Sequence, residues 1–227
     1  MVDPTRAPAA VLWDMDGTLV DTEPYWIEVE TELVESHGGT WTTEHAMNVV
    51  GGALIDSARY IGEHGGVDLP PEEIVELLLD GVVSHVERSV PWRPGARELL
   101  ADLRAAGVRC ALVTMSYERF VAPVLAALPK GSFDVVVTGD AVSRGKPHPE
   151  PYLHAARLLG VDPTHCLAIE DSNTGARSAE AAGCLVVVVE NHVPVAPGER
   201  RVFLPTLDGV TPSDLASLTV RPRRFGS

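Results

Sequence analysis

Cysteine is scarce in this chain. Its 227 residues include three cysteines, Cys110, Cys166 and Cys184, which stand far apart in apolar runs. An odd number at such spacings does not fit a disulfide framework, and the lack of a CxxC pair argues against a cysteine metal site. We therefore expect three buried thiols in a reducing compartment.

Basic residues and long apolar runs are scarce as well. The sequence has 18 Lys and Arg against 32 Asp and Glu, which gives a formal charge of -14. Such a surface repels nucleic acid and anionic membranes, so we expect neither as a partner, and an anionic substrate must be held locally. The apolar run at residues 9–13 stops at Asp14, too early for a signal peptide, and no long uncharged stretch follows. These absences favour a cytoplasmic protein.

What the sequence does contain is an alternation of helical and strand patterns. Apolar residues make up 45% of the chain, which is enough for a substantial core. Val-rich runs joined by helical segments predict an α/β fold with a doubly wound parallel sheet, a Rossmann-like core. The expected strands are 9–13, 108–114, 134–138, 166–170 and 184–189, and the expected helices between them are 96–106, 117–128, 149–159 and 174–182.

The segment between the first strand and Pro94 breaks this alternation. Apolar residues recur there at helical spacing in three stretches, 25–38, 53–65 and 70–87. A connection of about seventy residues is far longer than usual. We therefore expect an inserted α-helical cap domain at residues 21–89, and a catalytic core formed by residues 1–20 and 90–227.

Polar residues stand where four of the expected strands end. They are Asp14 and Asp16, Thr114 and Ser116, Thr138 and Asp140, and Glu170 and Asp171. Ligands bind beyond the carboxyl ends of the strands in parallel α/β sheets, so these residues are expected to meet along one rim. Gly17 permits a tight turn directly after the first pair. Several carboxylates so close together need a cation, and a hard, oxygen-binding ion such as Mg²⁺ fits best.

Three other kinds of site do not fit the spacing. An EF-hand loop that starts at the first aspartate would need Gly and Glu where Leu19 and Tyr25 stand. A zinc site would need a third ligand beside His148 and His154. A nucleotide-binding P-loop around Lys146 fails on the glycine spacing and on the proline that follows. Taken alone, Lys146 would be a solvated loop lysine, whereas beside a carboxylate rim it could stabilise a phosphoryl group.

Four ordered motifs carry a resemblance to a known family. They are DMDGT at 14–18, VTMS at 113–116, GKPHPEPY at 145–152 and IEDSNTG at 169–175. With these motifs the chain resembles the haloacid dehalogenase superfamily over about its whole length. The branch it resembles contains phosphatases and β-phosphoglucomutase-like enzymes whose helical cap follows the first strand. One departure is mild, because Met115 stands after Thr114 where many relatives have Asn or Ser.

The resemblance implies a two-step reaction on a phosphate ester. Asp14 would attack phosphorus and form an aspartyl phosphate, and Asp16 would act first as an acid and then as a base. Thr114, Ser116 and Lys146 would bind the phosphoryl oxygens. Because residues two apart on an extended strand point the same way, Asp14 and Asp16 can face one phosphoryl group.

The resemblance also implies a Mg²⁺ site. Its ligands would be the carboxylates of Asp14 and Asp171 and the backbone carbonyl of Asp16, with Glu170 near the coordination shell. Ser172 and Asn173 could orient these ligands, although Asn173 could equally cap the following helix. Positioning and charge neutralisation carry most of the catalysis in phosphoryl transfer, so this set is chemically sufficient.

The function expected is that of a Mg²⁺-dependent phosphomonoesterase that hydrolyses a small phosphorylated metabolite, such as a sugar phosphate or a phosphoglycolate-like acid. A sugar phosphomutase is the alternative, and a catalytically silent binding protein is a distant third. The resembling mutases carry a His and a basic residue where Trp26 and Leu54 stand here, which favours hydrolysis. Substrate contacts are expected from the cap, at Glu23, Trp26, Gly51 and Gly52, although Trp26 could equally be a core residue. The sequence leaves the oligomeric state open, with a monomer among the options.

Overall fold

The computed structural model describes residues 7–49 and 54–219. The chain divides into two compact units. The first contains Met1–Val20, Trp92–Tyr117 and Pro129–Ser227, and the second contains Asp21–Pro91 and Glu118–Leu128. None of the helices in the described ranges is long and apolar enough to cross a membrane.

The first unit is built on a six-stranded parallel sheet with the strand order β3-β2-β1-β4-β5-β6. The strands are β1 (Ala10–Trp13), β2 (Arg109–Val113), β3 (Val135–Val137), β4 (Cys166–Glu170), β5 (Leu185–Val188) and β6 (Arg201–Phe203). On the buried β1, Leu12 pairs with Ala111 on one side and with Ala168 on the other. Its continuous apolar run is typical of a strand covered on both faces. The predicted Rossmann-like parallel sheet is therefore confirmed.

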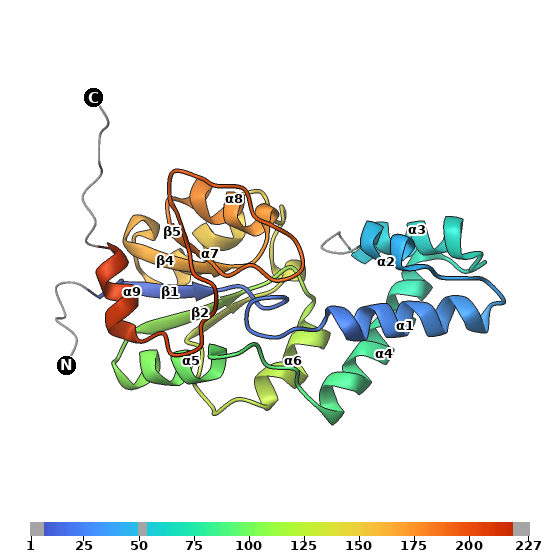
Figure 1. Cartoon of the computed structure of the whole chain (residues 1–227), viewed down its shortest axis with the longest axis horizontal. Helices are drawn as coiled ribbons and strands as arrows, with labels where there is room; N and C mark the ends of the chain where they lie inside the picture. The colour runs from blue at the N-terminus through green and yellow to red at the C-terminus, as the bar shows by residue number, and fades with distance from the viewer. Residues whose placement is uncertain (1–6, 50–53, 220–227) are drawn as a thin grey trace. The chain divides into compact units, whose positions relative to one another are not determined.

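Helices cover both faces of this sheet (Figure 1). α7 (Glu150–Leu159) and α8 (Asn173–Ala182) pack on one face, and α5 (Ala96–Ala105) packs on the other, in contact with α9 (Pro212–Thr219). The buried side of α8 carries Ala176, Ala179 and Ala182, small side chains that allow the helix to approach the valines of the sheet closely. Two short 3₁₀ helices lie in the connections, η1 (Gly139–Ala141) and η2 (Pro163–His165).

The second unit is helical. Its helices are α1 (Glu23–Ser36), α2 (Thr43–Val49), α3 (Leu54–Gly65), α4 (Pro71–Arg88) and α6 (Glu118–Ala126). The helices α1, α3 and α4 match the three stretches predicted from apolar periodicity. The helix α2 was not expected, because its seven residues are too few to display a helical repeat.

The helix α6 groups with this helical unit. Arg119 forms ion pairs with Glu76 and Asp80 of α4, and the Phe120 ring meets Trp26 of α1 edge to face, with ring centroids 5.5 Å apart. The sequence instead assigns residue 90 onward to the core, because a helix between two parallel strands normally covers their sheet. We keep the division into a catalytic core and a cap domain as a proposal.

Candidate active site

Three neighbouring strands bring predicted site residues to one edge of the sheet. β1 ends just before Asp14, β2 ends just before Thr114, and β4 ends at Glu170. The parallel order β2-β1-β4 places these carboxyl ends side by side. The Asp14 amide continues the pairing, since it donates to the Ile169 carbonyl at 3.0 Å. Residues distant in sequence therefore meet at the edge where ligands bind in such sheets.

Lys146 supplies a positive charge at this edge. Its ammonium nitrogen lies 2.6 Å from Asp14 Oδ1 and 2.6 Å from Glu170 Oε1, and 5% of its side chain is exposed. Burial alone would lower the pKa of Lys146, but the two adjacent carboxylates outweigh burial and raise it. Lys146 is therefore held as a buried cation, unlike an ordinary loop lysine.

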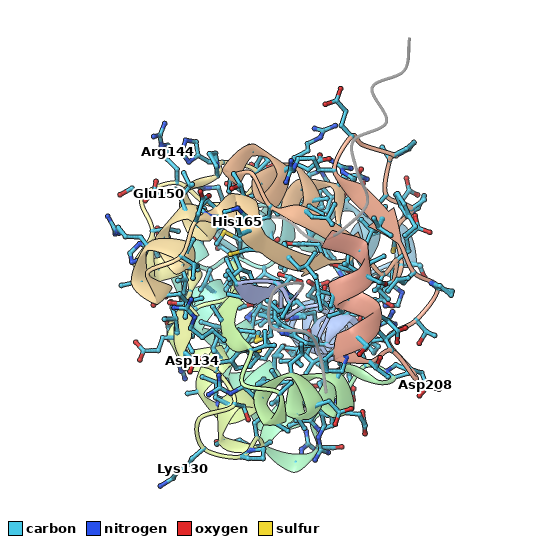
Figure 2. All side chains as sticks on the ribbon, turned by 90° about the vertical axis from the view of Figure 1, so that its left-hand side faces the viewer. Lys130, Asp134, Arg144, Glu150, His165 and Asp208 are labelled. Carbon is cyan, nitrogen blue, oxygen red and sulfur yellow. The ribbon has the colours of Figure 1, made fainter. Side chains whose placement is uncertain are left out.

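The loop before Lys146 is fixed by contacts on both sides. The Lys146 amide donates to the Met115 thioether sulfur at 3.1 Å. The carboxylate of Glu150, at the start of α7, accepts hydrogen bonds from the amides of Ser143 at 2.8 Å and Arg144 at 3.1 Å. Figure 2 shows Arg144 and Glu150 near one another, and Arg144 Nε lies 3.8 Å from Glu150 Oε2. Met115, the departure from the family pattern, thus helps to place this loop.

Three carboxylates form a group that could hold a metal ion. Asp14, Glu170 and Asp171 each offer an oxygen, and these oxygens lie within 4.8 Å of one another. Burial, followed by the neighbouring carboxylate charges, raises the pKa of both Asp14 and Asp171. Because the pKa values stay raised although Lys146 lowers them, such crowding opposes full ionisation unless a further cation is present, and an all-oxygen donor set suits hard divalent ions. The residues present therefore fit a divalent metal.

Gly17 packs directly against this carboxylate group. Its backbone φ is 84°, and a Cβ at this position would lie 1.9 Å from Asp171 Oδ2. Its amide donates to the Val20 carbonyl at 2.7 Å, which closes the turn that follows the strand. The turn expected from the sequence is present, and the close approach to Asp171 is a second reason for glycine.

The Asp16 carboxylate faces the second motif. Its Oδ2 accepts hydrogen bonds from the Ser116 hydroxyl at 2.6 Å and from the Thr114 hydroxyl at 3.3 Å. Thr114 is fully buried, and its hydroxyl oxygen also accepts the Ser116 amide at 3.0 Å. Thr114 and Ser116, both predicted to bind phosphate, therefore hold Asp16 in this structure.

The start of α8 lies against Glu170. The Ser172 hydroxyl accepts the Gly175 amide at 3.0 Å and donates to Glu170 Oε2 at 3.2 Å. Ser172 rather than Asn173 therefore caps this helix. The Asn173 side chain instead donates to the Pro194 carbonyl at 3.0 Å, which ties the loop after β5 to α8.

One polar residue at this site is not predicted from the sequence. Tyr152, on α7, is fully buried, and its hydroxyl donates to Glu170 Oε1 at 2.5 Å. It is the last residue of the GKPHPEPY motif, which is the available signal for a role beside Lys146. A tyrosine on the apolar side of a helix is, however, more often a core residue.

The predicted substrate contacts of the cap belong to the stretch of chain that forms the helical unit. Glu23 is the first residue of α1 and is half-buried, and Trp26 is half-buried against Phe120. Gly51 and Gly52 lie outside the described residues. A role of these residues in substrate binding stays a prediction.

The fold and this site together define a class, a protein with a Rossmann-like core and the donor groups for a divalent metal at the carboxyl ends of its strands. Residues 8–183 match the family described as haloacid dehalogenase-like hydrolase. The chain belongs to this family, which confirms the resemblance carried by the four motifs.

Relatives of known name cover most of the chain. Hexitol phosphatase B of Escherichia coli (strain K12) is 31% identical over 95% of this chain and 96% of its own length. A phosphoglycolate phosphatase of Pseudomonas savastanoi pv. phaseolicola is 33% identical over 82% of this chain and 72% of its own length. The crystal structure of CbbY from Rhodobacter sphaeroides in complex with phosphate is 27% identical, with a TM-score of 0.79 over 89% of this chain and 96% of that chain.

Proposed function

We propose that this protein is a Mg²⁺-dependent phosphomonoesterase that hydrolyses a small phosphorylated metabolite through an aspartyl phosphate on Asp14. The observation that carries the proposal is the arrangement around Asp14, whose carboxylate is bound by the buried Lys146 and stands two residues from a second, hydrogen-bonded aspartate. A nucleophile next to a fixed cation and a separate proton carrier are the parts that such a reaction needs.

In the first step, an Asp14 carboxylate oxygen attacks phosphorus and the bond from phosphorus to the ester oxygen breaks. Asp16 gives its proton to the departing alkoxide. In the second step, Asp16 takes a proton from the attacking water, the bond between Asp14 and phosphorus breaks, and inorganic phosphate leaves. The hydrogen bonds from Ser116 and Thr114 keep the Asp16 carboxylate in one orientation for both proton transfers.

The metal ligands in this proposal are the carboxylates of Asp14 and Asp171 and the backbone carbonyl of Asp16, with Glu170 close by. A bound Mg²⁺ would neutralise charge on the transferring phosphoryl group. Lys146 contributes a second positive charge next to the nucleophile, and it also offsets the charge of Glu170.

The names of the relatives support a substrate class for this proposal. Their names include a hexitol phosphatase and a phosphoglycolate phosphatase, so a polyol or sugar phosphate or a short phosphorylated acid is the class to test first. We also propose a cytoplasmic location, which agrees with three free, buried cysteines. A screen for phosphate release over a panel of such metabolites would identify the substrate.

Two aspartate variants test the mechanism. Asp14→Asn should lose turnover by about a thousandfold or more, because an amide is a poor nucleophile. Asp16→Asn should lose about a hundredfold or more, because its proton carrier is gone, yet keep its Mg²⁺ affinity in calorimetry, because only its backbone is a ligand. The control is Asp102→Asn, the same change at an exposed position of α5, which should behave as the wild type. Wild-type turnover by Asp14→Asn, or loss of Mg²⁺ binding by Asp16→Asn, would contradict these roles.

One assay separates hydrolysis from a phosphomutase reaction. A mutase must return the phosphoryl group to a sugar before water takes it. Trp26 cannot exchange a proton at neutral pH and its ring is packed on Phe120, so we expect hydrolysis to dominate. With β-glucose 1-phosphate, Mg²⁺ and a bisphosphate primer, free phosphate should exceed glucose 6-phosphate. Isomerisation many times faster than phosphate release would make the protein a mutase.

A further inference from the structure

A buried tyrosine stands behind the charged residues of the candidate site. Tyr152 has no exposed surface, and its hydroxyl donates to Glu170 Oε1 at 2.5 Å. The same oxygen accepts the Lys146 ammonium at 2.6 Å. The ammonium nitrogen also lies 5.2 Å from the centroid of the Tyr152 ring. Tyr152 therefore contacts Lys146 through its ring and Glu170 through its hydroxyl.

Glu170 needs such a partner because it is completely buried. A buried carboxylate without enough hydrogen-bond donors is costly, and it would draw a nearby cation towards itself. Here three side chains donate to it: Tyr152 and Lys146 to Oε1, and Ser172 to Oε2 at 3.2 Å. The hydroxyl of Tyr152 thus supplies one of the two hydrogen bonds to Oε1. Without it, Lys146 would be the remaining donor to that oxygen.

The position of Lys146 depends on how strongly Glu170 attracts it relative to Asp14. Its ammonium is equally distant, at 2.6 Å, from Glu170 Oε1 and from Asp14 Oδ1. If the tyrosine hydroxyl were removed, Glu170 would bind Lys146 more closely, and the interaction with Asp14 would weaken. The aromatic ring adds an attraction for the ammonium, which lies within the range of a cation–π interaction.

We propose that Tyr152 is a positioning residue that fixes Glu170 and thereby keeps the Lys146 ammonium beside Asp14. The inference rests on the proposed function, because the placement of Lys146 matters for turnover only if Asp14 reacts. Tyr152 touches no reacting atom in this proposal. Its effect is exerted through the Glu170 carboxylate.

The direct test is Tyr152→Phe, which removes the hydroxyl and keeps the ring. We expect kcat to fall about tenfold, with KM changed less than twofold, and the Mg²⁺ dissociation constant of the substrate-free protein to rise several-fold, as for residues that orient metal ligands. Tyr60→Phe is the matched control, because it also removes a hydrogen-bonded tyrosine hydroxyl, the one that accepts from Asn48 at 2.9 Å in the helical unit. Tyr60→Phe should change neither kcat nor the Mg²⁺ dissociation constant.

A double-mutant cycle shows whether Tyr152 acts through Glu170. In a Glu170→Gln background, Tyr152→Phe should lower kcat by less than twofold, because the group that it positions has been changed. An equal loss in both backgrounds would overturn the inference. Wild-type kcat and Mg²⁺ affinity in Tyr152→Phe, with only a lowered melting temperature, would also overturn it. A wild-type protein that binds Mg²⁺ but releases no phosphate would reject the proposed function, while the calorimetric comparison would still test Tyr152.

Discussion

Two glycines of the candidate site bring the backbone very close to a carboxylate. A Cβ on Gly17 would lie 1.9 Å from Asp171 Oδ2, and a Cβ on Gly175 would lie 1.9 Å from Glu170 Oε1. Gly175 is inside the helix α8, where glycine costs about 1 kcal/mol relative to alanine. A glycine at position 175 leaves free the space that the buried Glu170 side chain occupies.

Gly17→Ala should strongly reduce activity for this reason. The added methyl group must displace Asp171, and φ at 84° adds strain of about 1–2 kcal/mol for a residue with a Cβ. We expect turnover to fall about a hundredfold or more, as when a metal ligand or its support is displaced. Gly107→Ala is the control, because its φ is 76° and nothing lies within 4 Å of its Cβ position. In urea unfolding Gly107→Ala should lose only the stability that the backbone strain costs, whereas Gly17→Ala should lose more because of the added overlap with Asp171. Equal turnover in both variants would contradict the argument.

The individual residues of the site were predictable to different degrees. Asp14 and Lys146 belong to motifs whose spacing carries chemical meaning, so the sequence predicts both for one rim, and the structure brings them within 2.6 Å of one another. The contact between the Lys146 amide and Met115 joins residues 31 positions apart, and only the fold brings them together. Tyr152 is similar, since no local pattern distinguishes a tyrosine that binds a buried carboxylate from one that fills a core.

Among the elements, the beginning of α8 links helix stability to the site. Ser172 caps the helix through the Gly175 amide and also donates to Glu170. One hydroxyl thus caps the helix and also holds the Glu170 carboxylate. The short connection between β4 and α8 allows both contacts, because Glu170 ends the strand and Asn173 begins the helix.

Ser172→Ala should therefore affect both stability and catalysis. Loss of the cap costs about 1 kcal/mol of unfolding free energy, measured in urea. Loss of the bond to Glu170 should lower kcat severalfold, with little change in KM. Ser172→Thr keeps a hydroxyl in place and is the conservative control, expected to restore most of both quantities. If Ser172→Ala lost stability without any change in kcat, Ser172 would cap the helix without positioning Glu170 for catalysis.

The elements that escaped prediction are short or lack a pattern of their own. The strand β6 has three residues, Arg201–Phe203, at the edge of the sheet, and the helix α2 has seven. Their positions are set by packing against longer neighbours. The long strands and helices were predictable because a buried parallel strand must be apolar throughout, as AVLW in β1 is, and because amphipathic helices such as α5 repeat every three to four residues.

At the scale of the whole molecule, the two compact units are parts of one acidic chain. The formal charge of -14 includes carboxylates that are buried, and these affect folding differently from surface ones. Glu30, on α1, is 5% exposed and accepts a hydrogen bond from the Trp41 indole nitrogen at 3.1 Å. Burial raises the pKa of Glu30 from 4.5 to about 7, although the bond from Trp41 opposes the shift.

This raised pKa makes the helical unit more stable in mild acid. Between pH 4.5 and about 7 the folded chain retains a proton on Glu30 that the unfolded chain has lost. The stabilisation is fully present below pH 4.5 and is lost as pH rises through about 7, because stability falls with pH wherever the folded state binds more protons. Above that range, folding must bury an ionised carboxylate.

Glu30→Gln should remove this dependence, because glutamine stays neutral and can still accept the hydrogen bond from Trp41. At pH 8 we expect the variant to be more stable than the wild type by on the order of 2 kcal/mol, whereas at pH 5 the two should differ by less than about 1 kcal/mol. Urea unfolding at both pH values, followed by tryptophan fluorescence, measures this difference. Glu32→Gln makes the same charge change at an exposed position of α1 and should leave the stability nearly unchanged at either pH. If Glu30→Gln and Glu32→Gln shifted stability equally at pH 8, the effect would come from net charge and not from the buried carboxylate.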